Sequence, residues 1–178
     1  MKTMDTTVFY NPDLTQIING EEVMSPSPKL SHQRILFDLA FFLKRYVKDN
    51  NLGEVFIAPL DTILEDRFNV LQPDILFISN KQKDIMQDWV RGAPDMVVEV
   101  VSKGSFKMDT VIKKKIYERY GVKEYWIVFP EKTLVEVYTL YSGQYLLFGT
   151  FSGEQLIKTP IFPDFDAQAN AIFRDLNK

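Results

Sequence analysis

Two carboxylates occupy positions where burial makes a charge costly. Glu99 lies within residues 96–101 (MVVEVV), where every neighbour is apolar. A carboxylate in such a run is expensive to bury unless a metal ion, a cation or several hydrogen-bond donors compensate its charge. Asp74 follows Pro73 at the start of a second apolar run, residues 75–78, so its carboxylate is expected at the end of a strand. Each also has a plain structural reading: a buried ion pair for Glu99, and a turn that begins a strand for Asp74.

Taken together, the two carboxylates indicate a metal site. Carboxylates on adjacent strands can share one hard cation such as Mg²⁺, which prefers oxygen ligands and keeps several of its waters. Such an ion polarises a phosphodiester and lowers the pKa of the attacking water. Asp95 also follows a proline, but it lies four residues from Glu99, which is roughly 13 Å along a strand at about 3.3 Å per residue. We therefore interpret Asp95 as a residue that begins a strand.

Helices and strands are expected to alternate around these residues. Residues 31–50 carry apolar side chains at helical spacing, and Ser31 is expected to cap this helix. Residues 109–120 form a second expected helix, capped by Asp109 and closed by Gly121. Strands are expected at 55–58, 62–64, 75–78, 94–101, 124–129, 134–141 and 144–148, with hairpin turns at 65–69 and 142–143, a helix or helical loop at 81–90 and a short helix at 170–176.

This order of elements favours an α/β domain, with a mixed β-sheet core flanked by helices. The apolar run around Glu99 lacks polar alternation, which is typical of a strand covered on both faces. The unit from residue 97 through the second helix to residue 126 has the length of a parallel crossover. The helix at 109–120 is therefore expected to pack against the strand that carries Glu99.

The composition narrows the class of protein. The chain has 178 residues, of which 46% are hydrophobic and 25% charged, as in a soluble globular protein of one domain. It has no cysteine, which excludes disulfides, thiolate zinc sites and cysteine nucleophiles. We find no secretion signal and no apolar run of the ~20 residues that span a membrane, so a cytoplasmic location is expected.

The charge pattern bears on nucleic-acid binding. A net charge of −3 and a pI near 5.3 argue against a basic coat that wraps nucleic acid. Residues 103–123 nevertheless carry a dense group of lysines and arginines. This group is either a solvated helix face or a local patch that contacts phosphates.

An ordered set of segments resembles a known family. The segments are Gly20-Glu21, Met24-Ser25-Pro26, His32-Gln33, Gln72-Pro73-Asp74, residues 92–102 (GAPDMVVEVVS), Asp109-x3-Lys113-x3-Tyr117 and residues 121–128 (GVKEYWIV). Pro73-Asp74 followed by Glu99 resembles the motif of the PD-(D/E)xK nuclease superfamily, in which a lysine stands two residues after the glutamate. This chain has Val101 at that position. The whole set resembles the Uma family of candidate restriction endonucleases over about residues 14–173, within a single nuclease-like domain at 1–178.

The resemblance implies that the catalytic lysine has moved to the following helix, where Lys113 is the candidate. Asp109, Lys113 and Tyr117 are spaced four apart and share one helical face, so Lys113 can reach the space above Val101. A lysine there would stabilise the transition state or hold the nucleophilic water. Its structural alternative is a salt bridge with Asp109. Asp109 and Tyr117 themselves are accessory candidates.

Two residues around the start of the first helix are further accessory candidates. His32 is the sole histidine of the chain, and it would contact a phosphate or assist at the metal. A histidine near a helix end is, taken alone, more often structural or exposed. Glu21 would supply an additional acidic ligand, although the sequence does not fix its placement.

Three hypotheses follow. The first is an endonuclease that hydrolyses phosphodiester bonds in DNA and depends on Mg²⁺, which Mn²⁺ can replace. In this hypothesis Asp74, Glu99 and the backbone carbonyl of Val100 bind the ion. Lys113 acts on the attacking water and on the transition state. The second is a catalytically inactive nuclease-like module that binds DNA or a protein partner, which the acidic pI and the missing Glu-x-Lys pattern favour. The third is a structural ion pair at Glu99 in a protein of unrelated role.

The assembly and the substrate are less constrained by the sequence. A homodimer is expected of an enzyme that must cut both strands of a duplex. The choice between DNA and RNA, the sequence specificity, and nicking as opposed to double-strand cleavage stay open.

Overall fold

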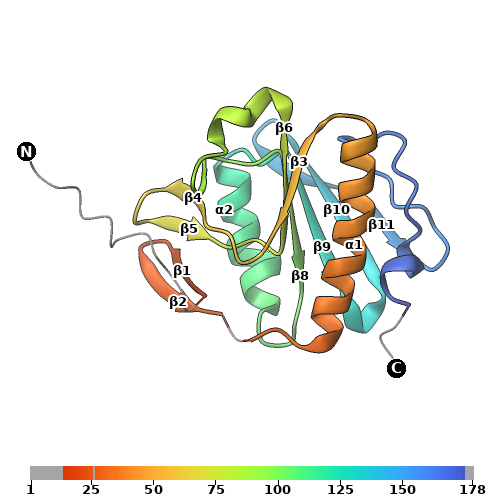
Figure 1. The fold of residues 1–178 in the computed structure, drawn as a ribbon. Coiled ribbons are helices and arrows are strands. Elements are labelled where there is room, and N and C mark those ends of the chain that lie inside the picture. The colour runs from red at the N-terminus through yellow and green to blue at the C-terminus, as the bar shows by residue number, and fades with distance from the viewer. Residues whose placement is uncertain (1–13, 26, 175–178) are drawn as a thin grey trace, which may run out of the picture.

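A six-stranded mixed sheet forms the centre of the molecule. The computed structural model describes residues 14–25 and 27–174. The strand order is β11-β10-β9-β8-β6-β3, and β8 and β9 form the one parallel pair of this sheet. Helix α1 (Leu30–Asp49) covers one face of the sheet, and α2 (Lys114–Arg119) packs on the other (Figure 1). The strands are β3 (Gly53–Ile57), β6 (Ile75–Ser79), β8 (Met96–Val100), β9 (Glu124–Phe129), β10 (Leu134–Tyr141) and β11 (Gln144–Ser152).

Burial on both faces explains the apolar run of β8. Successive side chains of a strand point to opposite faces, so Met96, Val98 and Val100 enter the core under α1. Val97 and the following Val101 enter the core under α2. Glu99 is on the same face as Val97, which places its carboxylate under α2. The crossover from β8 through α2 to β9 is parallel, as the sequence predicts.

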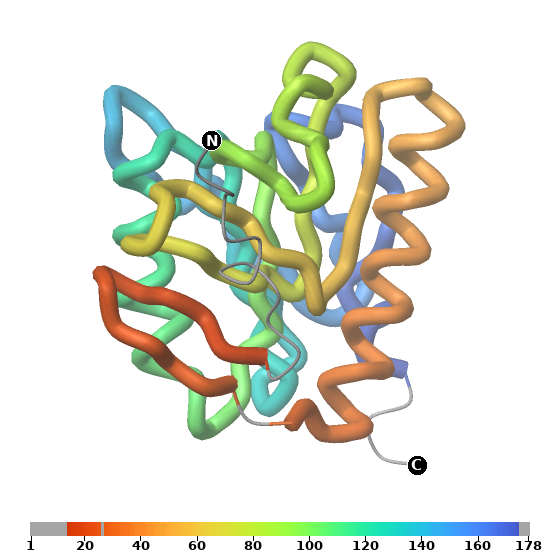
Figure 2. Tube along the Cα trace, turned by 60° about the vertical axis from the view of Figure 1, so that its left-hand side comes forward, coloured from red at the N-terminus to blue at the C-terminus, as the bar shows by residue number. Residues whose placement is uncertain are grey.

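A second, smaller sheet lies on the α2 side of the molecule. Its order is β2-β1-β5-β4-β7, and the β1–β2 and β4–β5 hairpins lie one above the other beside α2 (Figure 2). Tyr120, which follows α2, donates to Glu65 and accepts from Asn69, so it joins the helix to the β4–β5 hairpin. The strands are β1 (Thr15–Ile18), β2 (Glu21–Met24), β4 (Thr62–Glu65), β5 (Asn69–Leu71) and β7 (Val90–Arg91).

The helix after β8 begins earlier than the sequence predicts. Residues 106–107 are already helical, and the next turn is the π-helix η3 (Met108–Lys113), which continues into α2. Asp109 is therefore buried inside the helix and is not its cap, because its carboxylate faces Lys113 instead of a free backbone N–H. The expected end of this helix is confirmed: Gly121 follows it with a φ of +81°, a conformation that suits glycine.

Other predicted elements differ in detail. α1 begins at Leu30, so Ser31 lies within its first turn and is not the cap. The predicted helix or loop at 81–90 is helical only as far as the short 3-10 helix η2 (Asn80–Ile85), and Val90 already belongs to β7. The short helix predicted at 170–176 is the 3-10 helix η5 (Ala169–Ile172), and residues 175–176 lie outside the described part of the chain. A further 3-10 helix, η4 (Pro130–Lys132), joins β9 to β10. In the described ranges no helix is both long and apolar enough to cross a membrane.

A buried carboxylate attaches the C-terminal segment to the sheet. Glu124 is fully buried at the start of β9, and it accepts hydrogen bonds from the Trp126 ring nitrogen, the Thr159 hydroxyl and the Ile161 backbone N–H. Burial raises the pKa of the Glu124 carboxyl, and these donors oppose the rise. Because Thr159 and Ile161 lie 35 and 37 positions after Glu124, these two hydrogen bonds hold the C-terminal segment beside α1 in the same core.

Candidate active site

The sequence candidates gather at one end of the central sheet. There the first turn of α1, the start of β6, the end of β8 and the π-helical turn η3 lie near one another (Figure 1). β6 and β8 are antiparallel, with Ile75 opposite Val98. Continuing this register by one residue places Asp74 opposite Glu99, and directly opposed residues share a face of the sheet. The antiparallel pairing therefore brings two carboxylates together that are 25 positions apart in the sequence.

Two donors fix the orientation of Asp74. Its Oδ2 accepts from the Val100 backbone N–H at 2.7 Å and contacts Nε2 of His32 at 3.1 Å. Burial lowers the pKa of His32, but the hydrogen bond to Asp74 and the negative charge of Asp74 outweigh that effect, so the pKa is raised. The imidazolium form of His32 is therefore favoured beside Asp74. Both contacts use the same oxygen, which leaves Oδ1 outside this pair of bonds.

Glu99 is held in the same way. Its Oε1 accepts from Nζ of Lys113 and from the Tyr117 hydroxyl, each at 2.9 Å. Only 2% of the residue is exposed, and burial raises the pKa of its carboxyl to about 8, with Lys113 opposing the rise and Asp109 and Asp74 adding to it. Tyr117 is itself fully buried, which raises the pKa of its phenol well above the usual value and keeps it a hydrogen-bond donor.

Lys113 lies between two carboxylates. Its Nζ is 2.9 Å from Oε1 of Glu99 and 3.6 Å from Oδ1 of Asp109, and the side chain is 6% exposed. Burial would lower the pKa of Lys113, but Glu99, Asp109 and Asp74 raise it further than burial lowers it, so the ammonium is retained. Burial also raises the pKa of Asp109, against the effects of Lys113 and of a hydrogen bond from Ser105.

The side chains described above, from Asp74 and His32 to Glu99, Asp109, Lys113 and Tyr117, form a cluster in which acidic groups outnumber basic ones. Three carboxylates, those of Asp74, Glu99 and Asp109, influence one another and one buried ammonium. His32 adds at most one further positive charge. Burial is the main cause of the raised pKa values of Glu99 and Asp109, and the neighbouring carboxylates add to the rise, because a proton relieves the cost of a buried negative charge. A divalent cation would relieve it in the same way.

The donor set fits a hard divalent cation. Mg²⁺ is usually bound through one or two carboxylates and keeps several waters, so it does not need a cage of side chains. Within the described ranges no group of three or more histidine and acidic side chains is arranged to hold a metal ion. Asp74 and Glu99 would supply the one or two carboxylates that Mg²⁺ needs. Each uses a single oxygen for the hydrogen bonds described above, so its second oxygen can bind an ion. Their roles as metal ligands stay a prediction.

Most of the candidate residues lie together in the structure. Asp74, Glu99 and Lys113 converge, and Asp109 and Tyr117 lie on the helical face that the four-residue spacing predicts. Val100 joins the cluster through its N–H, which contacts Asp74. His32, ranked as an accessory candidate, contacts Asp74 directly. Catalytic roles for these residues remain predictions.

Two acidic residues lie outside the cluster. Glu21 is exposed on β2 and takes no part in the described contacts around Glu99. Asp95 is buried and accepts from the Ser79 backbone N–H, Gln82 and Lys123. These contacts hold the pKa of Asp95 below its usual range even though burial raises it. Asp95 therefore has the structural role that its position suggests.

Ser105 is a member of the cluster that the sequence reasoning missed. It donates a side-chain hydrogen bond to Asp109, and its hydroxyl also contacts the backbone N–H and the hydroxyl of Ser102. The signal was available in the sequence, because Ser105, Asp109, Lys113 and Tyr117 follow one another at intervals of four. The same helical face thus begins one turn earlier than expected.

The fold and this arrangement define a restriction-endonuclease-like α/β domain. A crystal structure from Anabaena variabilis ATCC 29413, described as a putative nuclease belonging to DUF820, has the same fold: the TM-score is 0.75 at 18% sequence identity, and 92% of each chain is covered. The family model described as "Putative restriction endonuclease", Uma2, matches residues 10–170, and the chain belongs to this family. None of the curated proteins compared with the chain matches it.

Proposed function

We propose that the chain is a single nuclease-like domain that hydrolyses phosphodiester bonds in DNA with the help of Mg²⁺, which Mn²⁺ can replace. The observation that carries the proposal is the excess of carboxylates at the end of β8, where the buried Glu99 and Asp109 contact one buried lysine and the half-buried Asp74 lies beside them. Burying such an excess is costly unless a cation is part of the working site. Membership of the nuclease family supports the same reading.

Some residues of the proposed site would bind the ion, and others orient the carboxylates that bind it. Asp74 and Glu99, with the backbone carbonyl of Val100, would hold the ion, which would supply Lewis-acid polarisation of the phosphate and a more acidic water. Tyr117 fixes the direction of Glu99, and the contacts of His32 and of the Val100 N–H fix Asp74.

Lys113 acts on the substrate side of the same site. Its ammonium is retained at neutral pH and is held in place by Glu99 and Asp109, so it can stabilise charge that develops on the phosphate. Two copies of the chain would be needed to cut both strands of a duplex at once, so we propose a homodimer as the active form.

The first test is cleavage of a supercoiled plasmid by the purified full chain, with Mg²⁺ or Mn²⁺ and with EDTA as the metal-free control. Asp74→Ala and Glu99→Ala are each expected to abolish cleavage, and Lys113→Ala to slow it by about 100-fold while divalent-ion binding in calorimetry is retained. Glu21→Gln is the matched control, because Glu21 is an exposed acid outside the cluster, and it should cleave normally. Wild-type chain that neither binds a divalent ion nor cuts DNA or RNA would overturn the proposal.

One observation favours a second candidate function. Glu99 already receives hydrogen bonds from both Lys113 and Tyr117, so its carboxyl group has protein partners without any metal. This is the arrangement expected of an inactive nuclease-like module that binds DNA or a protein. Retained DNA binding in a mobility-shift assay, together with absence of cleavage and of metal binding, would support this alternative.

A further inference from the structure

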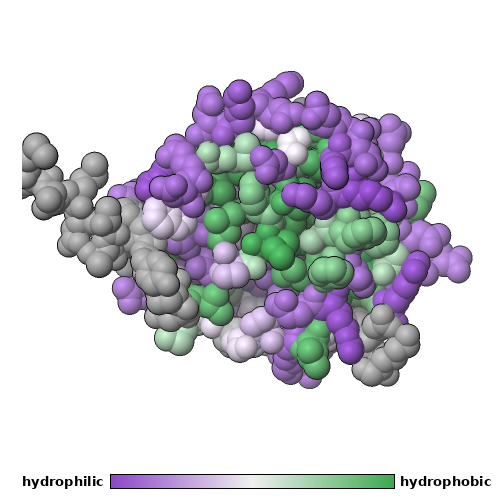
Figure 3. All heavy atoms as spheres, in the orientation of Figure 1, coloured by the Kyte–Doolittle hydropathy of each residue, from purple (hydrophilic) through white to green (hydrophobic). Residues whose placement is uncertain are grey.

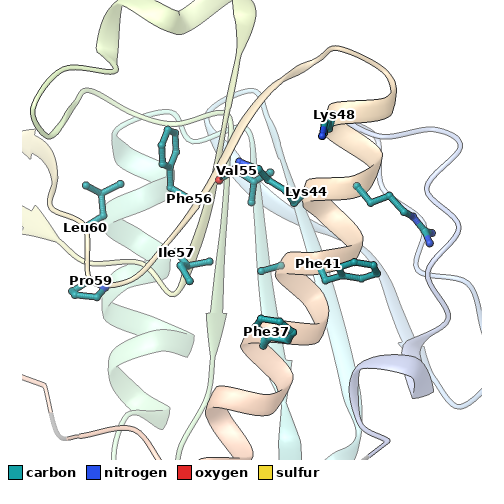
Figure 4. Close-up of a pocket in the computed structure, with 11 residues that line it drawn as sticks. Phe37, Phe41, Lys44, Lys48, Val55, Phe56, Ile57, Pro59 and Leu60 are labelled. Carbon is teal, nitrogen blue, oxygen red and sulfur yellow. Dashed lines mark hydrogen bonds between the residues drawn. The ribbon is translucent and has the colours of Figure 1, made fainter.

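An apolar groove lies between α1 and β3, and none of the residues that line it belongs to the candidate active site. Its volume is about 670 Å³. Phe37, Phe41 and Ile57 line it and are 70%, 54% and 48% exposed. Figure 3 shows apolar side chains gathered on this face within a rim of polar ones, and in Figure 4 Phe37 and Phe41 follow α1 across from Ile57 and Pro59. Contiguous exposed apolar surface of this kind marks binding sites.

Positive charge is concentrated at one end of this α1–β3 groove. Lys44 and Lys48 follow Phe41 along α1 and occupy the end near Val55 (Figure 4). The neighbouring Arg45 is paired with Asp166 at 3.2 Å. Among the residues that the structure describes, Lys44 and Lys48 form no ion pair with a carboxylate, and the groove lining contains no acidic residue. The groove is therefore apolar along its length and cationic at one end.

The groove also exposes hydrogen-bonding groups of a sheet edge. Among the described strands, β3 is the last of the six-stranded sheet and pairs with β6 alone. The backbone N–H of Ala58 donates to the backbone carbonyl of Asp74, and that of Asn80 donates to the backbone carbonyl of Leu52, so the even-numbered residues of this stretch bond to β6. Bonding alternates along an antiparallel strand. The N–H and C=O groups of Val55 and Ile57 therefore point away from the sheet.

Lys44 covers one of these outward groups. Its Nζ is 3.5 Å from the backbone oxygen of Val55, at the limit of a hydrogen bond. An incoming backbone N–H would make a better partner for that oxygen. The ammonium of Lys44 would then be released next to Lys48, where it can pair with an anion.

We propose that the α1–β3 groove binds an extended peptide segment of a partner protein, whose backbone adds a strand to β3. Alternate apolar side chains of this segment fill the groove beside Phe41 and Ile57, and an acidic residue at one end pairs with Lys44 and Lys48. Main-chain pairing gives affinity in this mode of recognition, and the side-chain positions give specificity.

Three observations separate this occupant from others. A lipid would satisfy the apolar lining and the lysines but not the outward-pointing backbone groups of β3. A nucleic acid would satisfy the lysines but not the exposed phenylalanines. A two-fold pairing of two copies would bring Lys44 and Lys48 of both chains into one interface, with no acid from the groove lining to compensate them.

The experiment selects binders for the full chain from a display library of random nine-residue peptides and measures the selected peptide by fluorescence anisotropy. Selected sequences are expected to alternate apolar residues and to end in Asp or Glu. Lys44→Glu combined with Lys48→Glu should weaken binding at least fivefold and favour a peptide in which the acids are replaced by lysine. The matched control is charge reversal at Lys158, which is exposed outside the groove and should leave binding unchanged.

Several results would overturn the proposal. One is a library that yields no binder, or binders without acidic residues. A second is undiminished binding of the selected peptide after N-methylation of alternate backbone nitrogens, which removes its strand-forming N–H groups. A third is a dimer in sedimentation that Ile57→Lys dissociates, since a second copy would then be the occupant. All of these measurements are independent of nuclease activity.

Discussion

The buried carboxyl of Glu99 should make the metal-free protein less stable as the pH rises. In the folded chain its pKa is about 8, compared with an ordinary value of 4.5, so between these values the folded state carries a proton that the unfolded state has lost. Stability falls with rising pH wherever the folded state binds more protons, by up to about 1.4 kcal/mol for each pH unit and each such group. From pH 5 to 7.5 the upper bound for Glu99 is about 3 kcal/mol. For a chain of this size that corresponds to a fall in Tm of roughly 6–12 °C.

Glu99→Gln tests this expectation directly. Glutamine has the same shape and can still accept hydrogen bonds from Lys113 and Tyr117, but it has no proton to lose. Calorimetric or fluorescence melting in EDTA from pH 5 to 7.5 should show a shallower fall in Tm for this variant. The Tm of this variant should still fall somewhat with rising pH, because the raised pKa values of His32 and Asp109 also favour protonation in the folded state.

The control and the refuting result are equally specific. Glu154→Gln changes an exposed glutamate, so its melting curves should follow those of the wild type. If the wild-type Tm rises or stays constant from pH 5 to 7.5, or if Glu99→Gln keeps the full wild-type slope, Glu99 is not the buried proton acceptor that its surroundings imply. The excess of negative charge in the cluster would then be smaller than the structure indicates.

Three further predictions concern the core and its hydrogen bonds. Leu39→Ala removes a fully buried side chain from α1 and should lower the free energy of unfolding by about 2–5 kcal/mol in urea titrations, whereas Phe37→Ala, at an exposed position of the same helix, should change it by less than about 0.5 kcal/mol. Tyr117→Phe removes one of the donors to Glu99 and should cost about 1–3 kcal/mol; an unchanged urea midpoint would contradict that hydrogen bond. Thr159→Val removes a donor from the carboxylate that anchors the C-terminal segment, and should also cost about 1–3 kcal/mol and speed hydrogen exchange of amides in residues 157–173.

The middle of the central sheet follows from the sequence because its inner strands are buried on both faces. Continuous apolar runs predict β6, β8 and β9, and the length of the connection predicts that β8 and β9 are parallel. The β1–β2 hairpin gives no such signal. Its second strand is almost wholly exposed and begins with two glutamates, so no apolar alternation identifies it. Pairing with β5 across the fold stabilises this hairpin instead.

The candidate site was partly accessible from the sequence for a similar reason. A carboxylate within an apolar strand is costly, and that cost singles out Glu99 in the sequence. Helical spacing puts Lys113 and Tyr117 on a common face, but the catalytic role expected of Lys113 rests mainly on the family resemblance. The contact between His32 and Asp74 could not be deduced, because it joins residues 42 positions apart on different elements, and only the packing of α1 against the sheet brings them together.

The π-helical turn η3 has a consequence for how related chains should be compared. A π-helical turn is an α-helical turn with one residue added, and such an insertion leaves the flanking helix intact. Glu99 and Lys113 are separated by 14 positions, and η3 lies inside that interval. A relative with a regular α-helix at this place would present the same ammonium to the same glutamate from a position one residue closer in sequence. Alignments of the family should therefore be anchored on the strand and on the helix separately, with a one-residue gap allowed between them, because a search pattern of fixed spacing would discard chains that carry the same site.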